Sequence, residues 1–206
     1  MEAFRKRGAY AKSATFRRAV LDAALQIVAE HGADAATLQQ IADQVGRSKA
    51  GLLHHFGSRE NLLLEIVRHR EALDSQRFRP RDDVSLEASI ELVGHNATVP
   101  GLIALFTVTA ALAASDPTPT ERREYFQQRY QRNRQGFARR IARAQSEGLL
   151  RDDIDPAAAA TLVLATMDGL QIQWLLDPGI DMGEHLRSLV TLLGPTRADP
   201  RAEGGV

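Results

Sequence analysis

The chain has no cysteine among its 206 residues. Disulfide bonds and thiolate metal ligands are therefore excluded, and a reducing compartment is allowed. Long apolar runs are also lacking, because the longest one, residues 99–114, is broken by Pro100, Gly101 and two threonines and is too short to span a bilayer. Residues 1–18 are basic and polar, with no apolar run behind them. We therefore expect no secretory leader, no membrane partner and a cytoplasmic location.

Signatures of cofactor sites and catalytic centres are absent too. The sequence has no P-loop, no dinucleotide-binding glycine cluster, no nucleophile elbow and no metal-ligand spacing, so we predict no cofactor and no metal. The adjacent pair His54 and His55 suggests catalysis or metal binding, but neighbouring helix positions point about 100° apart. Neither histidine has a carboxylate or a second histidine four residues away. A helical enzyme therefore remains only a minor alternative.

The formal net charge is zero, but the charges are unevenly distributed. Residues 1–70 contain eleven Lys and Arg against seven Asp and Glu, a net charge of +4, so the remainder carries −4. A basic N-terminal part joined to an acidic body is compatible with a nucleic-acid partner. With 44% hydrophobic residues, the chain also has enough apolar material for a core.

Apolar residues recur at helical spacing along most of the chain, and no alternation typical of strands occurs. One such face predicts a helix over residues 15–31, ended by Gly32. Three more helices follow, each beginning at a residue type that caps helix N-termini: Thr37, Ser48 and Ser58. Five further helices, mostly longer, come after a polar segment at 77–85. The sequence thus predicts an all-α fold of about nine helices.

The second and third predicted helices form a helix-turn-helix around Gly46. Apolar positions tie both helices to the first one, which leaves the N-terminal end of the third helix exposed. In such units this end enters the major groove of DNA. Small residues at Ala50 and Gly51 would permit the close approach that base edges and phosphates require.

Residues 37–63, "TLQQIADQVGRSKAGLLHHFGSRENLL", resemble the N-terminal domain of the TetR family of bacterial transcriptional regulators. Twelve residues carry the resemblance: Thr37, Ile41, Ala42, Gly46, Ser48, Leu52, His55, Phe56, Ser58, Arg59, Glu60 and Leu62. Most members have a tyrosine where this chain has Leu53, and its hydroxyl meets a DNA phosphate. The resemblance therefore implies that this contact is lost here, or is replaced by His54 or His55.

The resemblance implies a helix-turn-helix domain over residues 1–60, a helical effector-binding and dimerisation domain over 61–194, and a disordered tail over 195–206. Arg47 and Lys49 are the candidates for base or phosphate contacts, because a basic side chain can reach guanine or the backbone. The full set of predicted DNA-binding residues is Thr37, Arg47, Ser48, Lys49, Ala50, Gly51, His54, His55 and Arg59.

The C-terminal helices resemble the family more loosely, which implies a homodimer that pairs its last two helices with their copies. The predicted dimer interface comprises Leu162, Thr166, Leu170, Gln173, Leu186, Leu189, Val190 and Leu193. The family also holds small-molecule effectors in this domain. The candidate lining is His95, Phe106, Phe126, Met167, Gln171 and Trp174, although aromatic residues and Met at helical spacing more often form core.

We therefore predict a ligand-responsive repressor that binds a near-palindromic operator on double-stranded DNA as a homodimer. An effector-independent regulator is the alternative. A basic arm, Arg5, Lys6, Arg7 and Lys12, either reaches DNA or remains a solvated tail, and both roles stay open. The charged run 121–144 could bind nucleic acid, but its aromatic inner side favours a solvated helix face.

Overall fold

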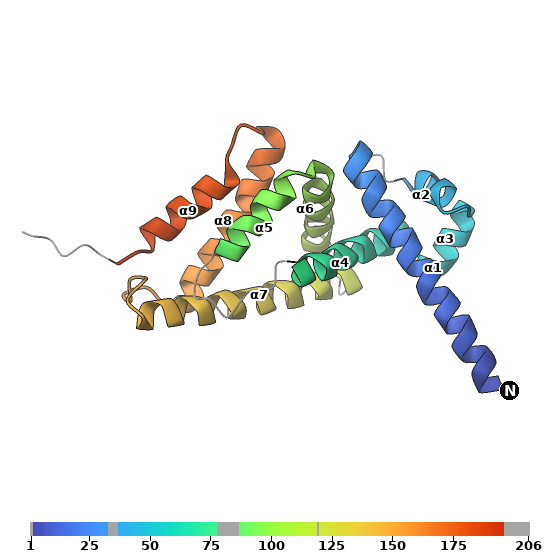
Figure 1. The fold of residues 1–206 in the computed structure, drawn as a ribbon, viewed down its shortest axis with the longest axis horizontal. Helices are drawn as coiled ribbons and strands as arrows, with labels where there is room; N and C mark the ends of the chain where they lie inside the picture. Colours follow the sequence, from blue (N-terminus) through green and yellow to red (C-terminus); the bar gives the residue numbers. More distant parts are fainter. Residues whose placement is uncertain (1, 33–36, 78–86, 119, 196–206) are drawn as a thin grey trace, which may run out of the picture. The chain divides into compact units, whose positions relative to one another are not determined.

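The computed structural model describes residues 2–32, 37–77, 87–118 and 120–195, and every regular element in these ranges is an α-helix (Figure 1). The helices are α1 (Glu2–His31), α2 (Leu38–Gln44), α3 (Lys49–Phe56), α4 (Arg59–Arg77), α5 (Glu87–Ala97), α6 (Pro100–Ser115), α7 (Glu121–Ser146), α8 (Pro156–Leu176) and α9 (Met182–Leu192). The predicted all-α fold with nine helices is confirmed for these residues. The predicted tail lies, from residue 196 onward, outside them.

Helix α1 is longer than the sequence pattern predicted. It begins at Glu2 rather than near residue 15, because residues that favour helices, mainly Ala, Arg, Lys and Glu, dominate this segment even though it lacks an apolar stripe. The four basic positions predicted as an arm therefore lie on helical backbone. Their side chains lie outside the described residues.

The chain packs into two compact units, and α5 and α7 contribute to both. The first unit contains Met1–Arg79 and His95–Phe126, and the second contains Pro80–Gly94 and Gln127–Val206. Helix α4 belongs to the first unit, where it packs against α1, α3 and α6. This grouping differs from the predicted boundary after residue 60, which remains a prediction about functional domains.

In the first unit, α6 meets α1 at Gly101. A Cβ at Gly101 would clash with the carbonyl oxygen of Val28 and lie only 2.9 Å from the Val28 Cγ1 atom. Only glycine allows the two helices this approach. The contact fixes α1 against α6, and α1 in turn supports α2 through buried residues such as Val20, Ile41 and Ala42.

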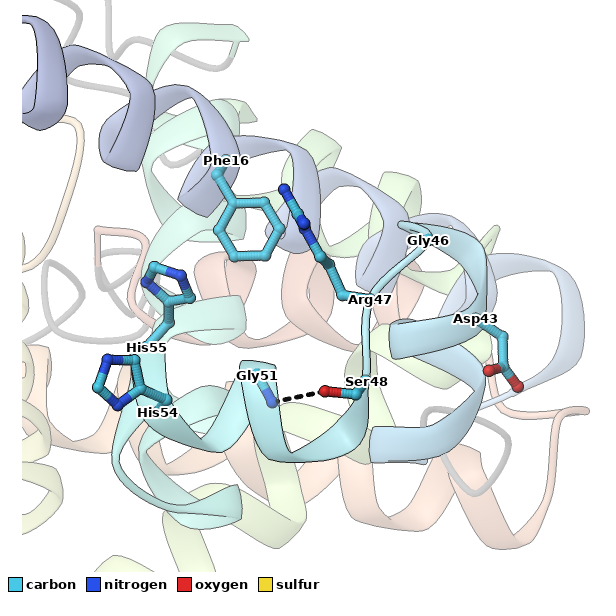
Figure 2. Close-up of a pocket in the computed structure, with 8 residues that line it drawn as sticks. All are labelled: Phe16, Asp43, Gly46, Arg47, Ser48, Gly51, His54 and His55. Carbon is cyan, nitrogen blue, oxygen red and sulfur yellow. Dashed lines mark hydrogen bonds between the residues drawn. The ribbon is translucent and has the colours of Figure 1, made fainter.

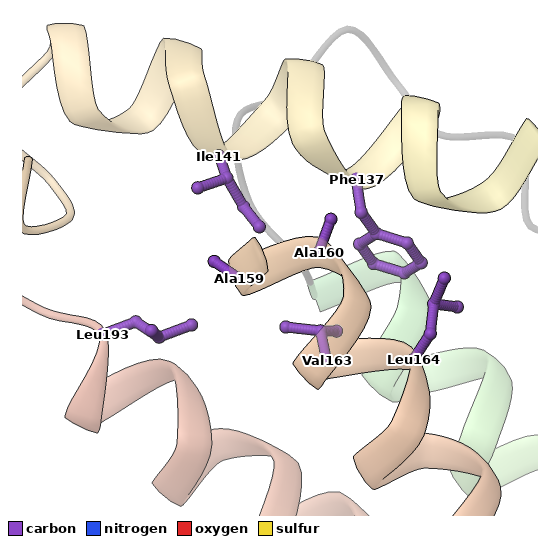
Figure 3. Packing of buried hydrophobic residues seen from close by; sticks show 7 residues of the cluster. All are labelled: Phe137, Ile141, Ala159, Ala160, Val163, Leu164 and Leu193. Carbon is purple, nitrogen blue, oxygen red and sulfur yellow. The ribbon is translucent and has the colours of Figure 1, made fainter. Parts of the chain in front are cut away.

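In the second unit, α7, α8 and α9 share one core (Figure 3). Phe137 and Ile141 of α7 point toward α8, where Ala159 and Ala160 present small side chains that permit close helix packing. The cluster is completed by Val163, Leu164 and Leu193. By length and composition alone, α8 could cross a membrane, but helices in the core of soluble proteins have the same composition. Six residues of α8 are buried within the chain.

Candidate nucleic-acid interface

Helix α2 begins at a capping box. The Thr37 hydroxyl oxygen accepts a hydrogen bond from the Gln40 amide at 3.2 Å, and the Thr37 amide donates to the Gln40 side-chain oxygen at 3.4 Å. These two bonds satisfy amides that the first turn of a helix leaves unpaired. The helix ends in a turn at Gly46, whose φ of 63° lies in the left-handed region that glycine adopts without strain.

Helix α3 is capped by Ser48, whose Oγ atom accepts from the Gly51 amide at 3.1 Å (Figure 2). Leu52 and Phe56 are buried beneath the helix. Lys49 and Ala50 lie exposed in the first turn, so the end of α3 that carries the free amides also carries the accessible side chains. The first turn of α3 contains no acidic residue, which leaves the helix dipole and the lysine to attract anions.

A hollow lies beside α3, between this helix, the turn and α1 (Figure 2). Five of the nine predicted DNA-binding residues line it: Arg47, Ser48, Gly51, His54 and His55. Lys49 and Ala50 are exposed next to them on the same helix. The other two predicted residues, Thr37 and Arg59, are exposed at the starts of α2 and α4.

The hollow is also lined by Phe16 and Asp43, two residues that the sequence analysis did not single out. The Arg47 guanidinium lies 5.4 Å from the centroid of the Phe16 ring, and the ring centroids of Phe16 and His55 are 4.7 Å apart. Phe16 thus lies between a cation and an imidazole, and it fixes both side chains at the edge of the hollow. Its spacing of four residues before Val20, which belongs to the apolar stripe of α1, was the available signal.

The neighbouring residue of α1 ties α3 and α4 together. The Arg17 guanidinium lies 4.9 Å from the Phe56 ring centroid of α3, and it pairs with the Glu65 carboxylate of α4 at 3.1 Å. A second α1–α4 contact joins the Asp22 carboxylate and the His69 ring at 2.6 Å. The position of α3 therefore depends on both α1 and α4.

The predicted effector residues divide between the two units. His95, Phe106 and Phe126 belong to the first, where the rings of Phe106 and Phe126 meet with centroids 5.6 Å apart. Burial lowers the pKa of His95, and the positive charges of Arg77 and Arg70 lower it further. Met167, Gln171 and Trp174 belong to α8 in the second unit. Met167 packs against the core cluster, Gln171 is half-buried and Trp174 is buried.

The second unit also contains a largely buried carboxyl group, that of Asp168. The Tyr130 hydroxyl of α7 donates to the Asp168 Oδ2 atom at 2.7 Å. Burial raises the pKa of Asp168, although the bond from Tyr130 and the nearby Arg129 charge oppose this effect. Burial and the Asp168 carboxylate also raise the pKa of Tyr130. The pair therefore places a desolvated acidic group on the inner side of α8.

The predicted dimer residues differ in burial. Leu170, Leu186 and Leu193 are buried within the chain. Thr166, Leu189 and Val190 are half-buried, while Leu162 and Gln173 are exposed. Three other large apolar residues of α8 and α9 are also exposed: Ile172, Leu176 and Leu192.

Two family models match this chain and together span about two thirds of it. Residues 20–66 match the model described as bacterial regulatory proteins, tetR family. Residues 102–193 match the C-terminal domain of BetI-type transcriptional repressors. The first match covers the helix-turn-helix, and the second covers α6 to α9.

The curated proteins that this chain is similar to are also transcriptional repressors and regulators. The transcriptional repressor AcnR of Corynebacterium efficiens is 26% identical over 159 residues, which cover 77% of this chain and 81% of that protein. AcnR of Corynebacterium glutamicum is 36% identical over 61 residues, and the match spans only about a third of that repressor, 32%. The transcriptional regulator BetI of Agrobacterium fabrum is 44% identical over 52 residues, 25% of each chain.

Solved structures share the fold along most of the chain. A regulator from Saccharomonospora viridis, solved in complex with choline, aligns with a TM-score of 0.65 at 27% identity and covers 85% of this chain and 93% of its own. A TetR-family regulator from Rhodococcus aligns with a TM-score of 0.67 at 23% identity, covering 87% and 98%, and supports the fold alone. The chain belongs to the tetR family of bacterial regulatory proteins and is a DNA-binding transcriptional regulator rather than an enzyme.

Proposed function

We propose that this regulator is a ligand-responsive repressor that acts in the cytoplasm and binds a near-palindromic operator as a homodimer. The observation that carries the proposal is the exposed first turn of α3. Its cap at Ser48, the exposed Lys49 and the small Ala50–Gly51 step form an end that fits the major groove. Beneath them, Leu52 and Phe56 fix the helix to the rest of the unit.

The residues of this surface have different roles in the proposal. Lys49 is the candidate for base contacts, since its exposed ammonium is free of the α1 contacts that hold Arg47 against Phe16. Arg47 and His55 are positioned by Phe16 for phosphate contacts at the edge of the groove. Leu53 has no hydroxyl to donate, so the phosphate contact expected there is assigned to His54 or His55.

The dimer contact is assigned to the outer face of α8. The residues Leu162, Ala165, Gly169, Ile172 and Leu176 follow one another at helical spacing and form a stripe, which we call the α8 stripe. Its three large side chains are 60%, 49% and 83% exposed. A Cβ at Gly169 would meet nothing within 4 Å, so the centre of the stripe is open to a neighbouring helix.

A second copy of the chain is the natural occupant of this stripe. An apolar helix face of this size is unfavourable in water, and small residues at its centre suit the close crossing of two like helices. Leu192 on α9 is another large apolar side chain that the chain leaves 73% exposed. Two-fold symmetry would then present two α3 helices to half-sites about 34–36 Å apart.

The proposed effector is a small organic cation. The relative from Saccharomonospora viridis was solved with choline, and this chain carries the largely buried Asp168 carboxyl group on α8. An ionised carboxylate in a desolvated site is a costly charge, which a bound cation would compensate. Tyr130 would hold the carboxylate in position through its hydroxyl. Coupling between the effector and DNA must be reciprocal, so operator DNA should weaken effector binding by the same factor.

The DNA-binding proposal is tested with DNA from upstream of the protein's own coding region. A gel-shift assay should show specific binding that weakens as salt increases. Analytical ultracentrifugation should find a dimer at micromolar concentration. If no genomic fragment is bound specifically, the operator proposal fails. A monomer under these conditions would remove the two-fold geometry.

The effector proposal is tested with choline as the probe. Isothermal titration calorimetry should detect binding to the intact protein, and Asp168→Asn should abolish it. Burial raises the pKa of Asp168, so this carboxylate takes up its proton at a higher pH than an ordinary aspartate does. Choline affinity should therefore fall as the pH is lowered through that pKa. Equal binding by wild type and Asp168→Asn would exclude this anchor. If no organic cation changes the affinity for the operator, the effector-independent alternative is favoured.

A further inference from the structure

The outer side of α7 has an unusual charge composition. Residues 127–146 contain six arginines but no aspartate, glutamate or lysine. In this segment the inner side of α7 buries Phe137 and Ile141, as the sequence predicted, and half-buries Tyr130. A helix face that only needs to be soluble usually mixes both signs of charge. Solvation alone therefore does not account for this composition.

Five of these arginines share one face of the helix. Counted from Arg129, they lie at i, i+3, i+10, i+11 and i+14, and we call them the α7 arginine face: Arg129, Arg132, Arg139, Arg140 and Arg143. Arg132 and Arg139 are exposed, and neither has an acidic partner among the described residues. Arg143 pairs with the Glu147 carboxylate at 2.9 Å. Arg129 and Arg140 lie over the rings of Tyr130 and Phe137, with 5.7 Å and 4.4 Å from guanidinium to ring centroid.

Gly136 lies on the same face, between Arg132 and Arg139. Glycine in the interior of a long helix weakens it, and usually has a packing reason. Here a Cβ would meet nothing within 4 Å, so no packing within the described chain requires the glycine. The missing side chain instead leaves the backbone open between two exposed arginines, where an external group can approach closely.

The spacing of the charges selects the class of partner. Arg132 and Arg139 are seven residues apart, or about 10.5 Å along the helix axis, so they cannot converge on one small anion. None of the large exposed apolar residues lies on the described part of α7. A protein partner or a membrane surface would ordinarily need such anchors. A linear array of arginines instead matches a polyanion with regularly spaced phosphates. Each guanidinium group can bind a phosphate through two parallel hydrogen bonds.

We infer that the α7 arginine face binds the phosphate backbone of duplex DNA, separately from the helix-turn-helix. Duplex DNA carries one charge for about every 1.7 Å of its axis, so a row of arginines can meet several phosphates at once. The inference rests on the DNA-binding role of the family, but not on the operator or the effector.

The test uses the full chain in an Arg47→Ala/Lys49→Ala background, so that recognition by α3 is removed. The probe is a fluorescein-labelled random duplex of about 30 base pairs, and anisotropy is measured from about 50 to 200 mM NaCl. Arg132→Gln/Arg139→Gln should reduce the slope of log affinity against log salt by about 1.8, since each phosphate contact contributes about 0.9. Affinity at about 50 mM salt should fall roughly tenfold or more.

The control removes two arginines that the second unit already pairs with its own acids. Arg151 lies 2.6 Å from Asp153, and Arg187 lies 3.9 Å from Glu87. Arg151→Gln/Arg187→Gln changes the net charge equally but should leave the slope nearly unchanged. Circular dichroism melts should show that both double variants are folded.

Three results would overturn the inference. The first is an equal slope change in both double variants, which would mean that only the total charge matters. The second is binding of single-stranded RNA but not of duplex DNA by the background variant. The third is a change of oligomeric state in Arg132→Gln/Arg139→Gln on sedimentation, which would make the arginine face a contact between copies of the chain.

Discussion

Helices α3 and α8 both leave conspicuous side chains uncovered, but of opposite chemistry. Helix α3 exposes a lysine, an alanine and two histidines over eight residues, and buries only Leu52 and Phe56. Helix α8 exposes Leu162, Ile172 and Leu176 over 21 residues, while other apolar residues of the same helix form the core. The first surface suits an anion, and the second is unfavourable until another apolar surface covers it. What a helix leaves exposed therefore indicates its partner more clearly than what it buries.

The largest effect is expected when the exposed apolar surface of α8 is disrupted. Leu162→Glu/Ile172→Glu would place two carboxylates on the α8 stripe, and burial between two copies would desolvate them. We expect a monomer in sedimentation and a loss of about 100-fold or more in operator affinity, because two linked half-site contacts become one. The fold should persist, since both side chains are exposed in the chain itself.

Leu149→Glu is the matched control for this variant. Leu149 is 57% exposed in the same unit but lies after α7 and is not part of the α8 stripe. It should leave both the dimer and operator affinity unchanged. If Leu149→Glu dissociates the dimer while the stripe variant does not, the contact between copies lies elsewhere.

The next effect concerns the polar side. Lys49→Ala removes the exposed cation from the first turn of α3, where we expect a base or phosphate contact. Operator affinity should fall by about 1–3 kcal/mol, or roughly 5- to 150-fold, with no change in the thermal melt. Fluorescence anisotropy with the operator measures this loss. Arg18→Ala on α1 removes an exposed charge away from the hollow and serves as the control.

These two surfaces also show how far the sequence could be interpreted. The α2–α3 unit was predictable because local chemistry determines it: a cap at Thr37, a turn at Gly46 and a cap at Ser48 bracket short amphipathic runs. Such signals act over three or four residues and need no knowledge of the remaining fold. The exposed residues of α3 followed directly from the buried ones.

The outward side of α8 could not be determined in this way. Apolar residues occur on all sides of this helix, so the periodicity of its sequence does not show which side faces the core. The predicted dimer interface included Leu170, which the chain buries, and omitted Ile172, which it exposes. Phe16 escaped notice for a related reason, because its contacts with Arg47 and His55 join residues more than thirty positions apart. Tertiary packing decided both cases.

A smaller effect compares two caps within the N-terminal region. Ser48 accepts from the Gly51 amide and Ser58 from the Asn61 amide, each at 3.1 Å. Ser48→Ala and Ser58→Ala should each lower the free energy of unfolding by about 1 kcal/mol in urea melts. Ser48→Ala should also weaken operator binding more than Ser58→Ala does, because its cap orders the turn that carries Lys49. Equal losses of DNA affinity would mean that the two helix ends contribute alike.

The smallest effect compares a helical glycine of α7, Gly136, with one of α3, Gly51. At Gly136, an added Cβ meets nothing, so Gly136→Ala should raise the free energy of unfolding by about 0.5–1 kcal/mol through helix propensity alone. At Gly51, the new Cβ would lie 3.3 Å from the Ser48 Oγ atom, so the cap must shift and most of this gain should be lost. Thermal unfolding of the two variants in parallel measures the difference. If Gly51→Ala stabilises the protein as much as Gly136→Ala, the cap tolerates the methyl group. The glycine in α3 would then be needed only for the approach of DNA, and operator affinity should fall although stability rises.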